Sequence, residues 1–174
     1  HCINLGFMRR ALEKVRLIRL KDGLSANPSF SREERSQHRA DVAACLRLLA
    51  SCGSFSKQAG GSANDLILAE RFGVVALCEE IIRNDGEEEE GGFRRDDPIV
   101  LGALGVLARI STDIVRVAGI FAEYNVLPLV TTQLNMVGVL PKEGIMYCLD
   151  VAFNTSSIQD EYVTLALPHM EKPI

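Results

Sequence analysis

Apolar residues recur at helical spacing along most of the chain, and three stretches share one layout. They are INLGFMRRALEKV (Ile3 to Val15), AERFGVVALCEEI (Ala69 to Ile81) and AEYNVLPLVTTQL (Ala122 to Leu134). Aligned, they place Gly6, Gly73 and Asn125 at one position, before two apolar residues. Glycine and asparagine adopt most readily the left-handed conformation that ends a helix. The pattern therefore predicts a helix end at Gly73 and Asn125, followed at once by a new helix.

Pro128 lies inside the third of these stretches, where a proline would break a continuous helix. If a new helix begins after Asn125, however, Pro128 is the third residue of that helix. Its missing N–H is then one that no helical carbonyl needs. The proline therefore indicates a helix start.

Longer apolar helices are expected in front of the turns at Gly73 and Asn125, at Asp41 to Cys52 and Ile99 to Ile110, and a further copy begins with Glu143 to Thr155. A short helix should follow the second of them, with Thr112 and Asp113 at its N-cap, and Asn64 and Asp65 should cap the matching helix before Gly73. Equivalent inner positions of the long helices predict five buried leucines: Leu46, Leu49, Leu104, Leu107 and Leu149.

The unit of long helix, short helix, sharp turn and further helix resembles the armadillo repeat family. GALGVLARIS and VRVAGIFAEYNVLPLVTTQL follow that family's pattern well, and CLRLLASC with LILAERFGVVALCEEII follows it less strictly. The resemblance implies an all-α fold, a right-handed α-solenoid with two full and two partial units and inserted loops. A single domain, 1–174, would hold the tail of a repeat (1–19), two repeats (39–83 and 98–137) and a partial repeat (142–174).

The spacing between the aligned turns is irregular, at 67 and 52 residues, where armadillo units have about 40–47. Polar stretches account for the excess and are interpreted as inserted loops: Leu20 to His38, Gly53 to Asn64 and Asn84 to Asp97. The last combines four consecutive glutamates with Arg94, Arg95, Asp96 and Asp97, whose charges would pair locally. Asp85 to Asp97 is expected to be an exposed loop that folding does not require.

Composition fits a globular chain, with 174 residues of which 47% are hydrophobic and 24% charged. The sequence contains no run of eighteen uncharged apolar residues, so no membrane-spanning helix is predicted. The five cysteines include no CxxC pair, which favours reduced core thiols in an intracellular protein. Within the cell, a cytoplasmic rather than a nuclear location is expected. Because the chain begins with His1 and has no initiator methionine, it is expected to be a fragment of a longer protein.

No motif in the sequence indicates catalysis. GxSxG, GxxxxGK[ST], HExxH and GxGxxG are all absent, and the histidines are scattered, so neither an enzyme, a cofactor nor a metal site is predicted. Residues 1–60 carry 11 Lys and Arg against 5 Asp and Glu, whereas residues 61–174 carry 8 against 18. This polarity could orient a partner, or simply be a solvated surface with an acidic loop. The N-terminal part has few aromatic residues, which disfavours nucleic-acid binding.

The resemblance implies that the longest helix of each repeat lines a groove that binds extended peptides or proteins. In the family's nuclear-import adaptors, a Trp, and an Asn four residues after it, recur along this groove. In this chain the Trp positions are occupied by Arg47, Gly105 and Asp150, and the Asn positions by Ser51, Arg109 and Asn154. With no tryptophan, only Asn154 matches. The polar groove residues would be Arg47, Ser51, Arg109, Asp150 and Asn154, although plain exposure to water on one helix face explains them too.

The expected function is therefore a non-catalytic scaffold or adaptor that binds protein partners. Two arginines among the groove positions suggest a partner with an acidic or phosphorylated segment. A regulatory domain of a larger enzyme and a nuclear-transport adaptor are the alternatives, and the missing tryptophan row counts against the second.

Overall fold

The structure is a computed structural model that describes residues 5–24, 31–51, 67–84, 97–135 and 140–170, with side chains of the last helix described as far as Ser157. Within these ranges the chain forms seven α-helices and no strand, which confirms the all-α prediction. The helices are α1 (Leu5–Leu24), α2 (Arg32–Ser51), α4 (Val74–Asn84), α5 (Pro98–Ile110), α6 (Ile114–Glu123), α7 (Val126–Leu134) and α8 (Lys142–Met170). A helical turn at 67–70 precedes α4, and a 3₁₀ turn, η1 (Ser111–Asp113), joins α5 to α6.

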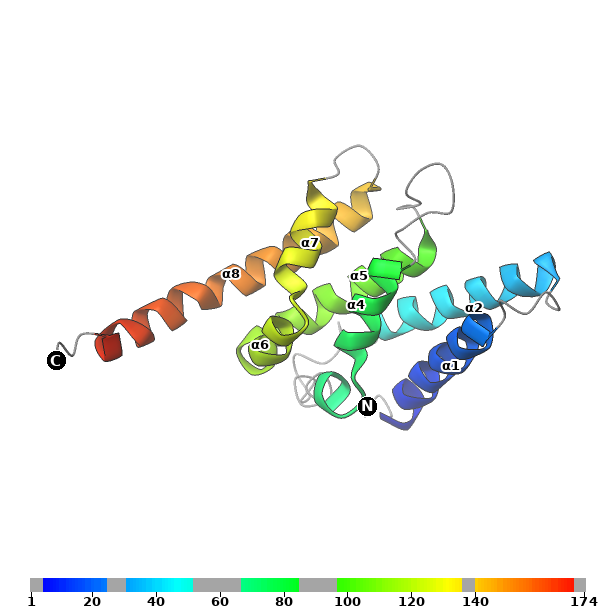
Figure 1. The fold of residues 1–174 in the computed structure, drawn as a ribbon, viewed down its shortest axis with the longest axis horizontal. Coiled ribbons are helices and arrows are strands. Elements are labelled where there is room, and N and C mark those ends of the chain that lie inside the picture. Colours follow the sequence, from blue (N-terminus) through cyan, green and yellow to red (C-terminus); the bar gives the residue numbers. More distant parts are fainter. Residues whose placement is uncertain (1–4, 25–30, 52–66, 85–96, 136–139, 171–174) are drawn as a thin grey trace.

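Three helices, α2, α5 and α8, pack side by side in that order and run in the same direction (Figure 1). Each has a second helix against it: α1 packs on α2, α4 on α5 and α7 on α8. In α5, eleven of the thirteen residues are buried. This central helix is therefore the main part of the core, as its position between α2 and α8 requires.

Two glycines allow α2, α5 and α8 to approach closely. A Cβ atom added at Gly102 of α5 would lie 2.7 Å from the Cβ of Leu46 on α2. A Cβ atom at Gly105 would lie 3.2 Å from the ring of Tyr147 on α8 and 3.3 Å from the Cβ of Ala50 on α2. Neighbouring helices therefore use the space that the missing side chains leave.

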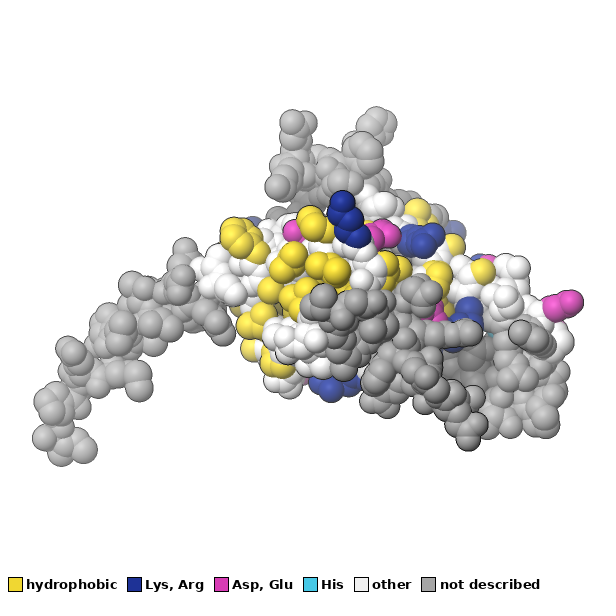
Figure 2. All heavy atoms as spheres, turned by 90° about the horizontal axis from the view of Figure 1, so that it is seen from above, with side chains coloured by type: hydrophobic (Ala, Val, Ile, Leu, Met, Phe, Trp, Pro, Cys, Tyr) yellow, Lys and Arg dark blue, Asp and Glu magenta, His cyan; other side chains and the backbone are white. Residues whose placement is uncertain are grey.

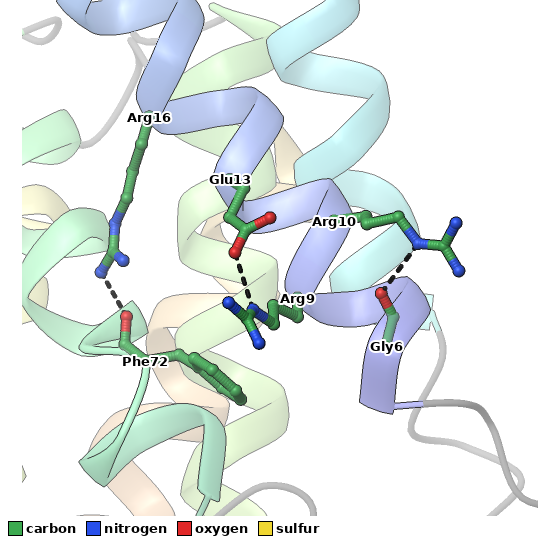
Figure 3. Close-up of polar contacts among 6 residues, drawn as sticks. All are labelled: Gly6, Arg9, Arg10, Glu13, Arg16 and Phe72. Carbon is green, nitrogen blue, oxygen red and sulfur yellow. Dashed lines mark hydrogen bonds and ion pairs between the residues drawn. The ribbon is translucent and has the colours of Figure 1, made fainter.

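The predicted turns are confirmed at Gly73 and Asn125, whose φ angles are 56° and 50°. Helix α7 begins at Val126, so Pro128 is its third residue, as the sequence predicted. The guanidinium of Arg16 in α1 donates a hydrogen bond to the carbonyl of Phe72, beside Gly73 (Figure 3). Gly6 does not form such a turn, since it lies in the first turn of α1, where its carbonyl accepts from Arg10 Nε at 3.2 Å.

The interpretation of Leu20 to His38 as a loop is wrong for most of its length. Helix α1 continues to Leu24, and α2 begins at Arg32. Ser31 and Glu34 form a reciprocal capping box: Glu34 N donates to Ser31 Oγ at 3.2 Å, and Ser31 N donates to Glu34 Oε2 at 2.8 Å. Glu33 and Glu34 are thus exposed residues in the first turn of a helix.

Asp97 departs from the prediction that Asp85 to Asp97 is an exposed loop. It is buried at the N-cap of α5, where its carboxylate accepts from Ile99 N at 2.8 Å. The same carboxylate pairs with Arg39 of α2. Asp97 therefore starts α5 and also connects it to α2. The rest of the acidic stretch, Gly53 to Asn64 and the proposed cap at Asn64 and Asp65 lie outside the described residues.

Four of the five leucines predicted to be buried are buried: Leu46, Leu49, Leu104 and Leu107 are at most 2% exposed. The prediction is wrong for Leu149, which is 48% exposed. Among the α8 residues whose side chains are described, Gly144, Cys148 and Val151 are buried, and no described helix covers the side of α8 that carries Leu149. Helix α8 also continues without a turn through Thr155 to Met170.

The segment Pro98–Glu123 is long and apolar enough to cross a membrane, judged by length and composition alone. In the fold, 72% of that window is buried, and η1 divides the segment into α5 and α6. Its apolar character is accounted for by its place in the core.

Candidate binding surface

The five polar residues predicted to line a groove lie on three adjacent helices. Arg47 and Ser51 belong to α2, Arg109 to α5, and Asp150 and Asn154 to α8. Because α2, α5 and α8 pack in this order, the five residues fall on neighbouring elements. We call them, together with Tyr147, the three-helix surface.

Arg109 connects two of these helices. Its Nη1 donates a hydrogen bond of 2.7 Å to the carbonyl oxygen of Leu49 in the last turn of α2, where carbonyls have no partner within the helix. Ser51, the last residue of α2, is exposed, and its hydroxyl donates to the carbonyl of Leu48 at 3.0 Å. Arg109 therefore helps to hold the end of α2 against α5.

Asn154 makes an equivalent connection between α8 and η1. Its Nδ2 donates to the hydroxyl oxygen of Ser111 at 2.9 Å, and that hydroxyl donates to the carbonyl of Ala108 at 2.6 Å. Ser111 is fully buried, so the amide of Asn154 fills the acceptor capacity of a polar group that water does not reach. Neither this contact nor that of Arg109 tests whether the two residues also touch a partner, and that stays a prediction.

Tyr147 is the member of the surface that the sequence analysis missed. Its half-buried ring covers Gly105, the position that lacks a side chain between Arg47 and Asp150 in the predicted row. The Tyr147 hydroxyl donates to Glu143 Oε1 at 2.8 Å. The signal in the sequence was the glycine itself, since a buried glycine in an apolar helix often marks a close approach by another group.

The charges of Arg47 and Asp150 both act on the Tyr147 hydroxyl. Burial, followed by the hydrogen bond to the Glu143 carboxylate and its negative charge, raises the pKa of Tyr147. Arg47 opposes the rise in the Tyr147 pKa, and Asp150 adds to it. Arg47 and Asp150 are themselves exposed. The structure thus places a cation and a carboxylate close enough to act on the Tyr147 hydroxyl, and the Tyr147 ring covers Gly105 of α5.

Within the described ranges, no group of three His, Cys, Asp or Glu residues is placed to hold a metal ion. Cys45, Cys78 and Cys148 are free thiols, and burial raises the pKa of Cys78 and of Cys148 to about 12. These two thiols stay protonated near neutral pH, which leaves them poor nucleophiles and poor metal ligands.

Comparison with known proteins gives no match to any family model, to any curated protein or to any solved structure. Any function must therefore be argued from the contacts of the fold itself.

Proposed function

We propose that the chain is a right-handed α-solenoid of armadillo-like repeats. Three observations support the proposal: the pairing of α1 with α2, α4 with α5 and α7 with α8; the consecutive packing of α2, α5 and α8; and the left-handed turns at Gly73 and Asn125. Repeats of this kind bury their apolar faces only against neighbouring repeats, which matches the arrangement of the three helix pairs.

The function that this surface supports best is that of a non-catalytic scaffold or adaptor, acting inside the cell and in the cytoplasm rather than the nucleus. The observation that carries the proposal is the ring of Tyr147 over Gly105, with exposed Arg47 and Asp150 close enough to act on the Tyr147 hydroxyl. Arginine and tyrosine are the residue types most enriched where protein interfaces bind most strongly. A protein segment lying across α2, α5 and α8 would contact all three side chains.

The chemistry of the surface defines the partner segment. Exposed Arg47 would pair with a carboxylate or phosphate, because a guanidinium binds such groups through two parallel hydrogen bonds. Asp150, on α8, would accept from a basic side chain or a backbone amide of the same segment. We therefore propose a protein partner whose bound segment carries an acidic or phosphorylated residue, with a hydrogen-bond donor farther along.

The test is to identify a partner by affinity purification with cross-linking and mass spectrometry, and then to measure its Kd by calorimetry. Arg47→Ala should weaken binding about tenfold, which corresponds to about 1.4 kcal/mol. Added salt should weaken binding to the unchanged chain more than binding to the variant. Arg47 is preferable to Arg109 for this test because removing Arg109 also removes a hydrogen bond to Leu49 within the fold.

Arg9→Ala is the matched control. Arg9 is an exposed arginine on α1 whose ion pair with Glu13 spans 2.7 Å on the same helix, so the substitution makes the same change in charge away from the three-helix surface (Figure 3). Binding that falls equally in both variants would mean that overall charge, and not the three-helix surface, attracts the partner. Binding unchanged by Arg47→Ala would remove the basis of the proposal.

A further inference from the structure

An apolar stripe on α8 lies exposed. It consists of Met146, Leu149 and Phe153, which are 51%, 48% and 77% exposed. Their spacing of three and four residues places them on one face of the helix. We call them the α8 stripe. On the face that Figure 2 shows, hydrophobic side chains gather in the half of the molecule that contains α6, α7 and the first part of α8, whereas Lys and Arg side chains lie singly.

The repeat register shows what such a stripe does elsewhere in the molecule. The register that aligns Arg47, Gly105 and Asp150 also aligns Leu46 with Leu149 and Ala50 with Phe153. On α2 these positions form the contact with α5, where Leu46 meets Gly102 and Ala50 meets Gly105. Counterparts of the stripe on α5 are likewise buried, and Leu101, the counterpart of Met146, meets Gly144 of α8. The stripe is thus the third copy of a helix-packing face, and it has no described helix against it.

The opposite end of the molecule carries the matching receptor. The α5 positions that receive α2 are Gly102, Gly105 and Arg109, and the same register aligns them with Ala44, Arg47 and Ser51 of α2. These three α2 residues are exposed, as is Leu48 beside them at 37%. We call Ala44, Arg47, Leu48 and Ser51 the α2 end face.

We propose that two copies of this chain associate head to tail, with the α8 stripe of one copy against the α2 end face of the next. By the register, Leu149 would lie against Ala44 as Leu46 lies against Gly102. Phe153 would lie against Arg47, where a guanidinium over an aromatic ring is attractive. Ala44 has a Cβ atom where Gly102 has none, so the two copies would lie farther apart at this point than α2 and α5 do.

Charge favours the same pairing. The α2 end face contains Arg47, and exposed Asp150 and Glu143 flank the stripe on α8. A head-to-tail contact therefore brings Arg47 of one copy near the acidic side chains beside the stripe of the other. Because the two contacting surfaces differ, the contact leaves a free stripe and a free end face and can repeat along a filament.

The test uses the 174-residue chain without any partner and measures its mass by sedimentation velocity and light scattering up to about 1 mM. The unchanged chain should exceed its monomer mass of 19.1 kDa as concentration rises. The stripe variant, Leu149→Gln with Phe153→Gln, should stay monomeric, and so should the end-face variant, Ala44→Glu with Leu48→Glu. Glutamine and glutamate are good helix formers, and circular dichroism checks the fold; Phe153→Gln alone is the milder variant.

Mixing the two variants gives the decisive result. The stripe variant keeps an intact end face and the end-face variant keeps an intact stripe, so an equimolar mixture should form a discrete 1:1 dimer. Val115→Gln is the matched control, because Val115 is an exposed apolar residue of α6, at 72%, outside both surfaces. Association of this control should equal that of the unchanged chain.

Three outcomes would overturn the inference. An unchanged chain that stays monomeric over the whole range has no such contact. A mixture that stays monomeric while the unchanged chain associates would show that the stripe and the end face do not contact each other. Equal loss of association in Val115→Gln would indicate non-specific adhesion. The inference rests on the proposed repeat register, but it is read from the mass of the chain alone, so its failure is distinguishable from a failure of partner binding at the three-helix surface.

Discussion

Gly102 provides a sharp test of how closely α2 and α5 pack. In most helix interiors, replacing glycine by alanine stabilises by about 0.5–1 kcal/mol, because alanine loses less backbone freedom on folding. At Gly102 the new Cβ would lie 2.7 Å from the Cβ of Leu46, whereas carbon atoms in contact sit about 3.5–4.0 Å apart. Neither atom can rotate away, because both are fixed to a backbone. One helix must therefore move by about 1 Å.

Overpacking of this kind costs about 1–3 kcal/mol. After the gain in helix propensity, Gly102→Ala should lower the free energy of unfolding by about 1–2 kcal/mol. Gly119→Ala in α6 is the control, because a Cβ there meets nothing within 4 Å and the position is exposed. It should raise the free energy of unfolding by about 0.5–1 kcal/mol.

Urea unfolding followed by circular dichroism measures both changes, and for a chain of this size about 1 kcal/mol moves the Tm by about 2–4 °C. The two substitutions should move the Tm in opposite directions. If Gly102→Ala stabilises as much as Gly119→Ala, then α2 does not cross α5 at this glycine, and the register used for both proposals loses its main support.

Three further predictions follow from other contacts. Gly73→Ala should destabilise the fold by about 1 kcal/mol, because the φ of Gly73 is 56°. Gly73→Asn should cost less, since the equivalent turn has an asparagine, Asn125, at a φ of 50°. Equal costs in chemical unfolding would argue against a left-handed turn. Asp97→Ala should cost about 1–2 kcal/mol through loss of the α5 cap, and Asp97→Asn should recover part of it, which thermal melts would detect. Burial raises the pKa of Cys78 and Cys148 from 9.0 to about 12, so the unfolded chain ionises first and stability should fall as pH rises from about 9 to 12; Cys78→Ala with Cys148→Ala should flatten that dependence in unfolding curves measured across the range.

Features that depend on one residue and its immediate neighbours could be predicted from the sequence. Gly73 and Asn125 are examples, because few residue types tolerate a positive φ and the apolar pairs after them begin a helix. The capping box at Ser31 and Glu34 is equally local, and its sequence signal was present but not used.

Contacts with residues from another helix could not be predicted from the sequence. The spacing of apolar residues places Leu149 on an apolar face of α8. It could not show that no described helix covers this face. Arg109 and Asn154 stood out as polar residues on apolar helices, yet their partners, the Leu49 carbonyl and Ser111, come from different elements. Asp97 likewise pairs with Arg39, which is 58 residues away in the sequence.

The shared direction of α2, α5 and α8 has an electrical consequence. Residue numbers rise in the same direction along neighbouring helices. Leu46 meets Gly102 and Ala50 meets Gly105 between α2 and α5, and Leu101 meets Gly144 and Gly105 meets Tyr147 between α5 and α8, so the three helices are parallel. Peptide dipoles in a helix add to a partial positive charge at its N-terminus and a partial negative charge at its C-terminus. Parallel packing places ends of like sign at the same edge, where they repel. Arg109 puts a full positive charge against the Leu49 carbonyl at the negative edge and offsets part of that repulsion. The stack is thus polarised from one edge to the other by its backbone, and this polarity persists at any pH at which the helices stay folded.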